Sequence, residues 1–121
     1  MPNCFAMTWT VRPGTEEEVI KLFENYGRPE HVITDKDGNV TGKLLTTTVF
    51  MKDNRIVRVI EFEGSIIDVA QHMGRQPAIR ELEDKLDGYI ENPRDMSTPE
   101  GARKFFMETA MRTLVSRRWD E

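Results

Sequence analysis

Large apolar residues alternate with smaller or polar ones along the first segment of the chain, Asn3–Arg12. One face of this segment carries Phe5, Met7, Trp9 and Val11. The other carries Cys4, Ala6, Thr8 and Thr10. A period of two residues is typical of a β-strand. The pattern therefore predicts a strand with one strongly apolar face, which ends at Pro13-Gly14.

The next segment has the periodicity of an amphipathic helix. Its apolar positions recur at i, i+3, i+4 and i+7, as Val19, Leu22, Phe23 and Tyr26. Thr15 and Glu18 have the spacing of a capping box, and Gly27 is a residue type that commonly ends helices. The sequence predicts a helix between these two signals.

Two β-rich runs, Leu44–Lys52 and Arg55–Glu63, flank Asp53-Asn54 and are predicted to form a tight hairpin. The turn signal at 37–39 predicts that Val32–Thr34 pairs with the strand that follows it. In the second run one face carries Val57 and Val59, and the other carries Ile56, Ile60 and Phe62. A strand that is apolar on both faces is usually covered on both. We therefore expect helices on one side of the sheet and a second layer on the other.

Three helices are predicted after the hairpin. Ser65 caps the first, which runs through Gly74. Pro77 breaks it and opens the second, and the run Ser97-Thr98-Pro99-Glu100 begins the third. Met111–Val115 is predicted as a last strand, although its helix propensity competes.

The order of these elements is the βαββαβ order of a ferredoxin-like fold, and we predict one α+β domain over residues 1–121. The open face of such a sheet needs a partner. A second copy that stacks sheet on sheet would supply it, which predicts a homodimer of the dimeric α/β-barrel type. Antibiotic-biosynthesis monooxygenases and small polyketide cyclases share this fold by analogy.

Composition narrows the classes of function. The net charge is −4 and no block of Lys and Arg is available for a phosphate backbone, so nucleic acid is not an expected partner. No apolar run reaches membrane-spanning length, and the single cysteine, Cys4, cannot form an internal disulfide. We expect a protein of the reducing cytoplasm, without membrane contact. No metal-ligand, phosphate-cradle, flavin or haem pattern occurs, so no cofactor is expected.

Four segments carry a family resemblance: TTVFM, IVRV with the acidic residue and glycine that follow, DVAQHMGRQP and ENPRDMSTPEGARKFF. In their order and residue identities they resemble the SchA/CurD-like family, small proteins of bacterial aromatic polyketide and spore-pigment clusters. The resemblance implies a tailoring protein, either a cofactor-independent monooxygenase or a cyclase, that acts on a polycyclic phenolic intermediate. The alternative is a non-catalytic chaperone or scaffold for the polyketide synthase or its nascent product. Besides a second copy, the expected partners are an aromatic polyketide and a synthase or carrier protein.

His72 is the helix-borne residue that titrates nearest neutral pH, and it lies one turn after Asp68. In one interpretation Asp68 orients His72 as the general base at the rim of a pocket between sheet and helices. In the other the two form an exposed i, i+4 pair, which helical spacing favours.

Five further residues are candidates for binding an aromatic substrate. Trp9 and Tyr26 line a slot for the ring or belong to the core, where such aromatic residues are more often found. Arg75 binds a peripheral oxygen or ends a helix in solvent. Arg58 and Glu61 place charges in a two-faced apolar strand, so each is buried, aimed into a cavity or paired across the dimer. Of these, pairing across the dimer is the use we expect.

Overall fold

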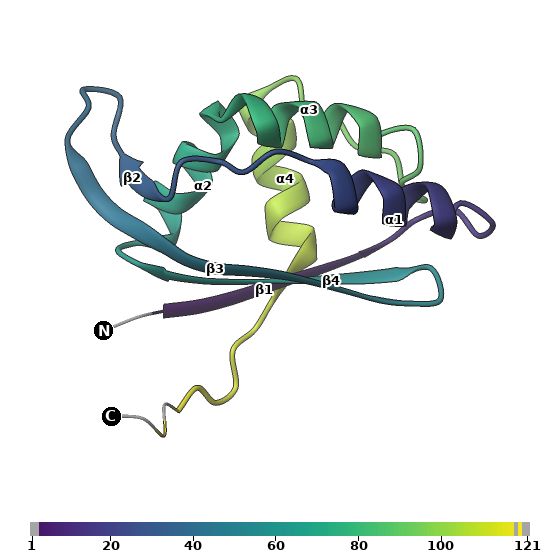
Figure 1. Ribbon diagram of the computed structural model, residues 1–121, viewed down its shortest axis with the longest axis horizontal. Helices are drawn as coiled ribbons and strands as arrows, with labels where there is room; N and C mark the ends of the chain where they lie inside the picture. The colour runs from purple at the N-terminus through teal and green to yellow at the C-terminus, as the bar shows by residue number, and fades with distance from the viewer. Residues whose placement is uncertain (1–2, 118, 120–121) are drawn as a thin grey trace.

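The computed structural model describes residues 3–117 and 119. They form an α+β fold in which four helices lie over one face of a five-stranded antiparallel sheet (Figure 1). The strands are β1 (Asn3–Thr10), β2 (Val32–Thr34), β3 (Val40–Lys52), β4 (Arg55–Glu63) and β5 (Ala110–Met111). The helices are α1 (Glu16–Asn25), α2 (Ile66–Arg75), α3 (Pro77–Leu86) and α4 (Pro99–Thr109). The sheet order β2-β3-β4-β1-β5 is consistent with the predicted ferredoxin-like fold.

The start of α1 differs from the sequence prediction. Thr15 is the N-cap, but its hydroxyl makes no cap hydrogen bond and instead donates to the carbonyl of Arg12 at 2.6 Å. The carboxylate that reaches back belongs to Glu16, which accepts from the Gly14 N–H at 2.8 Å. The predicted capping box of Thr15 and Glu18 is therefore wrong, because the turn at Gly14 brings the Arg12 carbonyl to the hydroxyl.

Both predicted hairpin turns are confirmed. The Asp35 carboxylate accepts hydrogen bonds from the N–H groups of Asp37 and Asn39, each at 2.9 Å, and so closes the turn between β2 and β3. These bonds, with that of the Asn39 N–H the strongest, lower the pKa of Asp35. Between β3 and β4, Asp53 adopts a left-handed backbone conformation with φ 52°.

The helices after the hairpin begin where the sequence predicts. The Ser65 hydroxyl accepts the Asp68 N–H, Pro77 is the first residue of α3, and the Thr98 hydroxyl accepts the Gly101 N–H. The predicted last strand over Met111–Val115 is largely wrong. Helix α4 continues to Thr109, and β5 is only two residues long, so the segment from 112 to 115 forms no strand.

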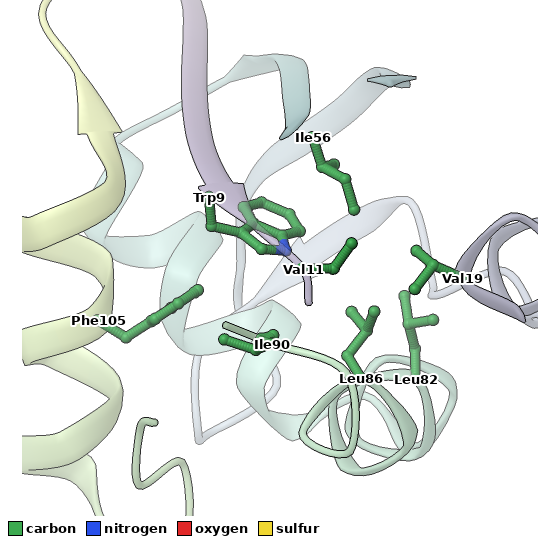
Figure 2. Packing of buried hydrophobic residues seen from close by; sticks show 8 residues of the cluster. All are labelled: Trp9, Val11, Val19, Ile56, Leu82, Leu86, Ile90 and Phe105. Atoms are coloured by element: carbon green, nitrogen blue, oxygen red, sulfur yellow. The ribbon is translucent and has the colours of Figure 1, made fainter. Parts of the chain in front are cut away.

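The core lies between the sheet and the helices in two clusters. The cluster under α1, α3 and α4 consists of Trp9, Val11, Val19, Ile56, Leu82, Leu86, Ile90 and Phe105 (Figure 2). The cluster under α2 consists of Ile33, Leu44, Ile60, Phe62, Val69, Met73 and Ile79. Every second residue of β4 from Ile56 to Phe62 is buried in this layer.

The opposite side of the sheet, which we call the open face, has no helix on it among the described residues (Figure 1). Val57 and Val59 on β4 are half-buried there, and their cross-strand neighbours include Ala6, Thr8, Thr48 and Phe50. Phe50 is 57% exposed. The open face is thus partly apolar and accessible.

Candidate functional site

A pocket of about 350 Å³ opens between α1 and the β3–β4 hairpin. It is lined by Ile20, Phe23, Glu24, Tyr26, Thr47, Val49, Phe50, Met51 and Ile56. The walls are mostly apolar, and Tyr26 packs edge-on against Phe23 with ring centroids 6.1 Å apart. A few polar groups in an apolar concavity are typical of a small-molecule site. We call this the α1–hairpin pocket.

Tyr26 takes its position from the end of α1. It is the C-cap residue, and its extended backbone, with φ −78° and ψ 151°, turns the chain away from the helix. A second hollow of about 240 Å³, between α1 and α3, also has Tyr26 in its wall but is rimmed by Lys21, Glu81 and Lys85. Seven residues were predicted for the site. Of these, Tyr26 alone is among the residues that line the two hollows, and it lines both.

His72 lies in the interior, at 2% exposure, so the interpretation of an exposed helical pair is wrong. Its Nε2 is 2.8 Å from the carbonyl oxygen of Glu30, and its Nδ1 is 3.5 Å from the N–H nitrogen of Thr34. Because a carbonyl only accepts and an N–H only donates, Nε2 fits the role of donor and Nδ1 that of acceptor. His72 thereby joins α2 to the chain around β2.

Asp68 and Arg75 lie on the same helix as His72 but have other partners. In the part of the chain that the structure describes, Asp68 makes no hydrogen bond or ion pair with His72. The Asp68 N–H donates to the Ser65 cap. Arg75 donates from Nη2 to the carbonyl of Thr34 at 2.5 Å and is otherwise exposed. Neither side chain lines the α1–hairpin pocket.

Trp9 is a core residue, 7% exposed, as the core interpretation of this aromatic residue expects. It packs edge-on against Phe105 of α4, with ring centroids 6.1 Å apart (Figure 2). Its Nε1 is buried and has no hydrogen-bond partner among the described residues. A buried donor left in this state costs free energy.

Arg58 points into the helix layer instead of the open face. It is 4% exposed, and its Nη1 lies 3.8 Å from Oε1 of Glu83 on α3 in the same chain. The expectation that Arg58 pairs across a dimer is therefore wrong, because the pleat of β4 places it on the same side as Ile56 and Ile60. Glu61 has the other parity and stands opposite Cys4 and Thr46 on the open face. Its pairing across a dimer stays a prediction.

Arg94 and Glu83, which the sequence pattern did not indicate, complete a buried ionic cluster with Arg58. Arg94 Nη2 lies 2.6 Å from Glu83 Oε2, and Arg94 Nε lies 2.7 Å from Asp87 Oδ1. The guanidinium of Arg94 also stacks over the Phe105 ring, 4.3 Å from its centroid. The sequence signal for this cluster was weak, since Arg94 stands in a polar linker that looks solvated.

No group of three or more His, Cys, Asp or Glu residues in the described chain has the arrangement of a metal site. None of the helices in residues 3–117 has the length and apolar character needed to span a bilayer. The candidate site therefore combines an apolar pocket, with a phenolic hydroxyl in its wall, and a neighbouring buried cluster of guanidinium groups.

The architecture defines a small α+β domain with helices on one face of an antiparallel sheet and an apolar pocket between the two layers. The chain belongs to the SchA/CurD like domain family, whose model matches residues 2–118. No solved structure gives a significant match.

Three relatives from Streptomyces are similar to most of the chain. The "42.8 kDa protein in whiE locus" of Streptomyces coelicolor is 44% identical over 107 residues, which is 88% of this chain and 25% of that protein. "Polyketide synthase CurD" of Streptomyces cyaneus is 38% identical over 88% of this chain and 28% of its own length. "Protein SchA" of Streptomyces halstedii is 38% identical over 88% and 27%, respectively. The chain thus spans about a quarter of the length of these curated relatives.

Proposed function

We propose that this protein takes part in aromatic polyketide biosynthesis, as a tailoring protein that binds a polycyclic phenolic intermediate in the α1–hairpin pocket. Membership of the SchA/CurD like domain family and the similarity to a protein described as a polyketide synthase support the pathway. The observation that carries the binding mode is the pocket itself, with apolar walls from two layers and Tyr26 at the end of α1. Its volume of about 350 Å³ lies in the lower part of the range for ligand sites.

Two reactions fit such an occupant, and both begin with the loss of a proton from the substrate. In a cyclisation the resulting enolate carbon attacks a carbonyl carbon, a C–C bond forms, and water leaves. In a cofactor-independent oxygenation the carbanion form of an anthrone is oxidised by O₂, with a quinone and water as products. Either path needs stabilisation of a negatively charged oxygen.

His72 stays the base predicted from sequence, but Asp68 makes no hydrogen bond or ion pair with it, both of its ring nitrogens face backbone groups, and the ring does not line the pocket. Base catalysis at His72 would need one of these contacts to open. Tyr26 offers a hydroxyl in the pocket wall, which would hydrogen-bond a ring oxygen and help to orient the substrate.

The pocket is tested by filling it. Thr47 is exposed and lines the pocket, so Thr47→Trp should fill the cavity without disturbing the core. Thr46→Trp is the matched control, because a β-bulge between positions 44 and 46 leaves Thr46 opposite Glu61, on the open face. Binding of 1,8-dihydroxyanthrone, followed by calorimetry, should weaken at least about tenfold in the first variant and stay unchanged in the control.

A crystal soaked with the same anthrone gives the second readout. Ring density between α1 and the hairpin would support the tailoring protein. Equal binding by both tryptophan variants, or ligand density on the outer surface alone, would contradict it.

A non-catalytic chaperone or scaffold is the second candidate, and the partly apolar open face favours it. In that version a second copy, a synthase or a carrier protein covers this face, and the pocket has no substrate. Pigment production in cells would then survive Thr47→Trp but fail when the open face carries a charge, as in Val59→Asp.

A further inference from the structure

Besides the hydroxyl of Thr41, four buried hydrogen-bond donors have no acceptor among the residues that the structure describes. They are Nε1 of Trp9, Nε and Nη2 of Arg58, and Nη1 of Arg94. The side chains of both arginines are 5% exposed. Buried polar groups are nearly always hydrogen-bonded, so four unsatisfied donors in one protein of this size call for an occupant.

The residues that carry these donors are linked by a chain of contacts. Glu83 contacts both guanidinium groups, Arg58 at 3.8 Å and Arg94 at 2.6 Å. Arg94 stacks on Phe105, and the same ring packs against Trp9. The cluster therefore lies between the sheet, α3 and α4. Figure 2 shows its aromatic part, where the rings of Trp9 and Phe105 meet edge-on and the indole nitrogen points toward Val11.

The carboxylates of the cluster leave several of its donors without an acceptor. Glu83 is the one carboxylate shared by both arginines, and Asp87, which binds the Nε of Arg94, is 40% exposed and partly in solvent. The cluster thus holds two guanidinium groups and two carboxylates, and the Oε2 of Glu83 is itself buried without a hydrogen bond. An oxyanion that accepts several hydrogen bonds would satisfy the free donors.

The cluster also adjoins the α1–hairpin pocket. Val49, which lines the pocket, is the cross-strand partner of Arg58. Ile56, another lining residue, is the cross-strand partner of Trp9. Directly opposed side chains on one face of an antiparallel pair have Cβ atoms about 5 Å apart. Arg58 and Trp9 are therefore neighbours of residues that line the pocket, although none of Arg58, Trp9 and Arg94 lines it directly.

We propose that Arg58, Arg94 and Trp9 form an oxyanion-binding site for a phenolate or enolate oxygen of an aromatic ligand whose rings occupy the α1–hairpin pocket. This inference rests on the proposed function and specifies its substrate as a molecule ionised at oxygen. The guanidinium groups and the indole N–H bind the oxygen, and Glu83 and Phe105 hold the arginines in place.

The test uses alizarin, a hydroxyanthraquinone whose phenolate has its own visible absorption, and anthraquinone, which lacks the hydroxyl groups. The background is Trp119→Phe, because Trp119 is 87% exposed and its removal leaves Trp9 as the reporter. Alizarin should bind at least about tenfold more tightly than anthraquinone and quench Trp9 fluorescence. Its apparent pKa should fall by at least about one pH unit on binding, since nearby cations favour the phenolate.

Two variants remove donors in different ways. Trp9→Phe deletes one N–H and keeps an aromatic ring, and Arg58→Lys keeps the charge but loses the Nε donor. Each should weaken alizarin binding about tenfold and leave anthraquinone binding unchanged. Because Trp9→Phe lacks the reporter, absorbance of the bound dye follows binding in every variant. Arg80→Lys, an exposed position on α3, is the matched control and should behave as the parent.

Each outcome decides between the two proposals. If alizarin and anthraquinone bind equally well and neither variant changes this, the oxyanion site is contradicted while the pocket stands. If neither compound binds, both proposals fail. If Arg58→Lys does not fold, the selective loss of alizarin binding in Trp9→Phe still decides the assignment.

Discussion

His72 shows how a single side chain fastens the edge of this sheet. Short edge strands have few hydrogen bonds of their own, and β2 has three residues. The imidazole binds the carbonyl of Glu30 before this strand and faces the N–H of Thr34 at its end. Arg75 adds a hydrogen bond to the Thr34 carbonyl from one helical turn further on. Helix α2 therefore holds β2 through two polar side chains as well as through the apolar contacts of Ile33.

From this geometry we predict that His72→Leu destabilises the fold. The substitution keeps much of the side-chain volume but leaves the Glu30 carbonyl without its donor and removes the acceptor near Thr34. Leaving one such group unsatisfied costs about 1–3 kcal/mol, so we expect a loss of about 2 kcal/mol in the free energy of unfolding, measured in urea. His31→Leu, at an exposed neighbouring position, is the control. A loss below about 0.5 kcal/mol for His72→Leu would show that the ring does not hold β2.

The sequence could not predict the surroundings of His72. Helical periodicity placed it at the border of the apolar stripe, which is compatible with exposure. Its actual partners are backbone groups about 40 positions earlier, in a segment whose composition is polar and irregular. The same reason hid Arg94, since its partners Glu83 and Phe105 come from two different helices. Local patterns predict which face a residue is on, but not what a distant segment brings to it.

At the scale of elements, we expect opposite changes in stability when two helical glycines are replaced by alanine. A Cβ added to Gly101, near the start of α4, would overlap the carbonyl oxygen of Asp95, while a Cβ added to Gly74 in α2 has nothing within 4 Å. Alanine is favoured over glycine within helices by about 1 kcal/mol. We therefore expect Gly74→Ala to raise the free energy of unfolding by up to about 1 kcal/mol and Gly101→Ala to lower it.

Thermal and urea unfolding of the two variants side by side check this prediction. Each serves as the control of the other, because both replace a helical glycine with the same residue. Stabilisation by Gly101→Ala would mean that the loop 91–98 moves freely away from α4, contrary to the close approach of Asp95.

The elements themselves were largely predictable. Period-two and period-3.6 patterns, proline at the first helical position and the turn residues located β1 to β4 and all four helices. Where the prediction fails, local hydrogen bonds favour a helix over the predicted strand. At the C-terminal end Thr109 donates its hydroxyl back to the carbonyl of Phe105 within α4, and only Ala110 and Met111 pair with β1. The segment 112–115, which carries the branched residues that suggested a longer strand, does not continue this pairing with β1.

At the scale of the whole molecule, apolar residues lie on both faces of the sheet. The helix layer covers one face and both core clusters lie there. On the other face, Val57 and Val59 alternate with residues that the helices bury, as the sequence predicted for a two-faced strand. The fold class followed from element order, but the sequence holds no direct signal for what covers this second face. A second copy stacked face to face is our prediction, because two sheets pack through such surfaces about 10 Å apart.

That prediction is tested by placing a charge at the centre of the open face. Val59 pairs with Thr48 on one side and Ala6 on the other, so Val59→Asp would put a carboxylate among small, partly apolar neighbours. Burial of an unpaired charge between two sheets is strongly unfavourable, so the variant should be monomeric while the parent sediments at about twice the 14.1 kDa chain mass. Ile67→Asp, at a position on α2 that is 66% exposed, is the control and should leave the mass unchanged. A monomeric parent would contradict the stacked dimer, since the open face would then be stable in water without a second copy.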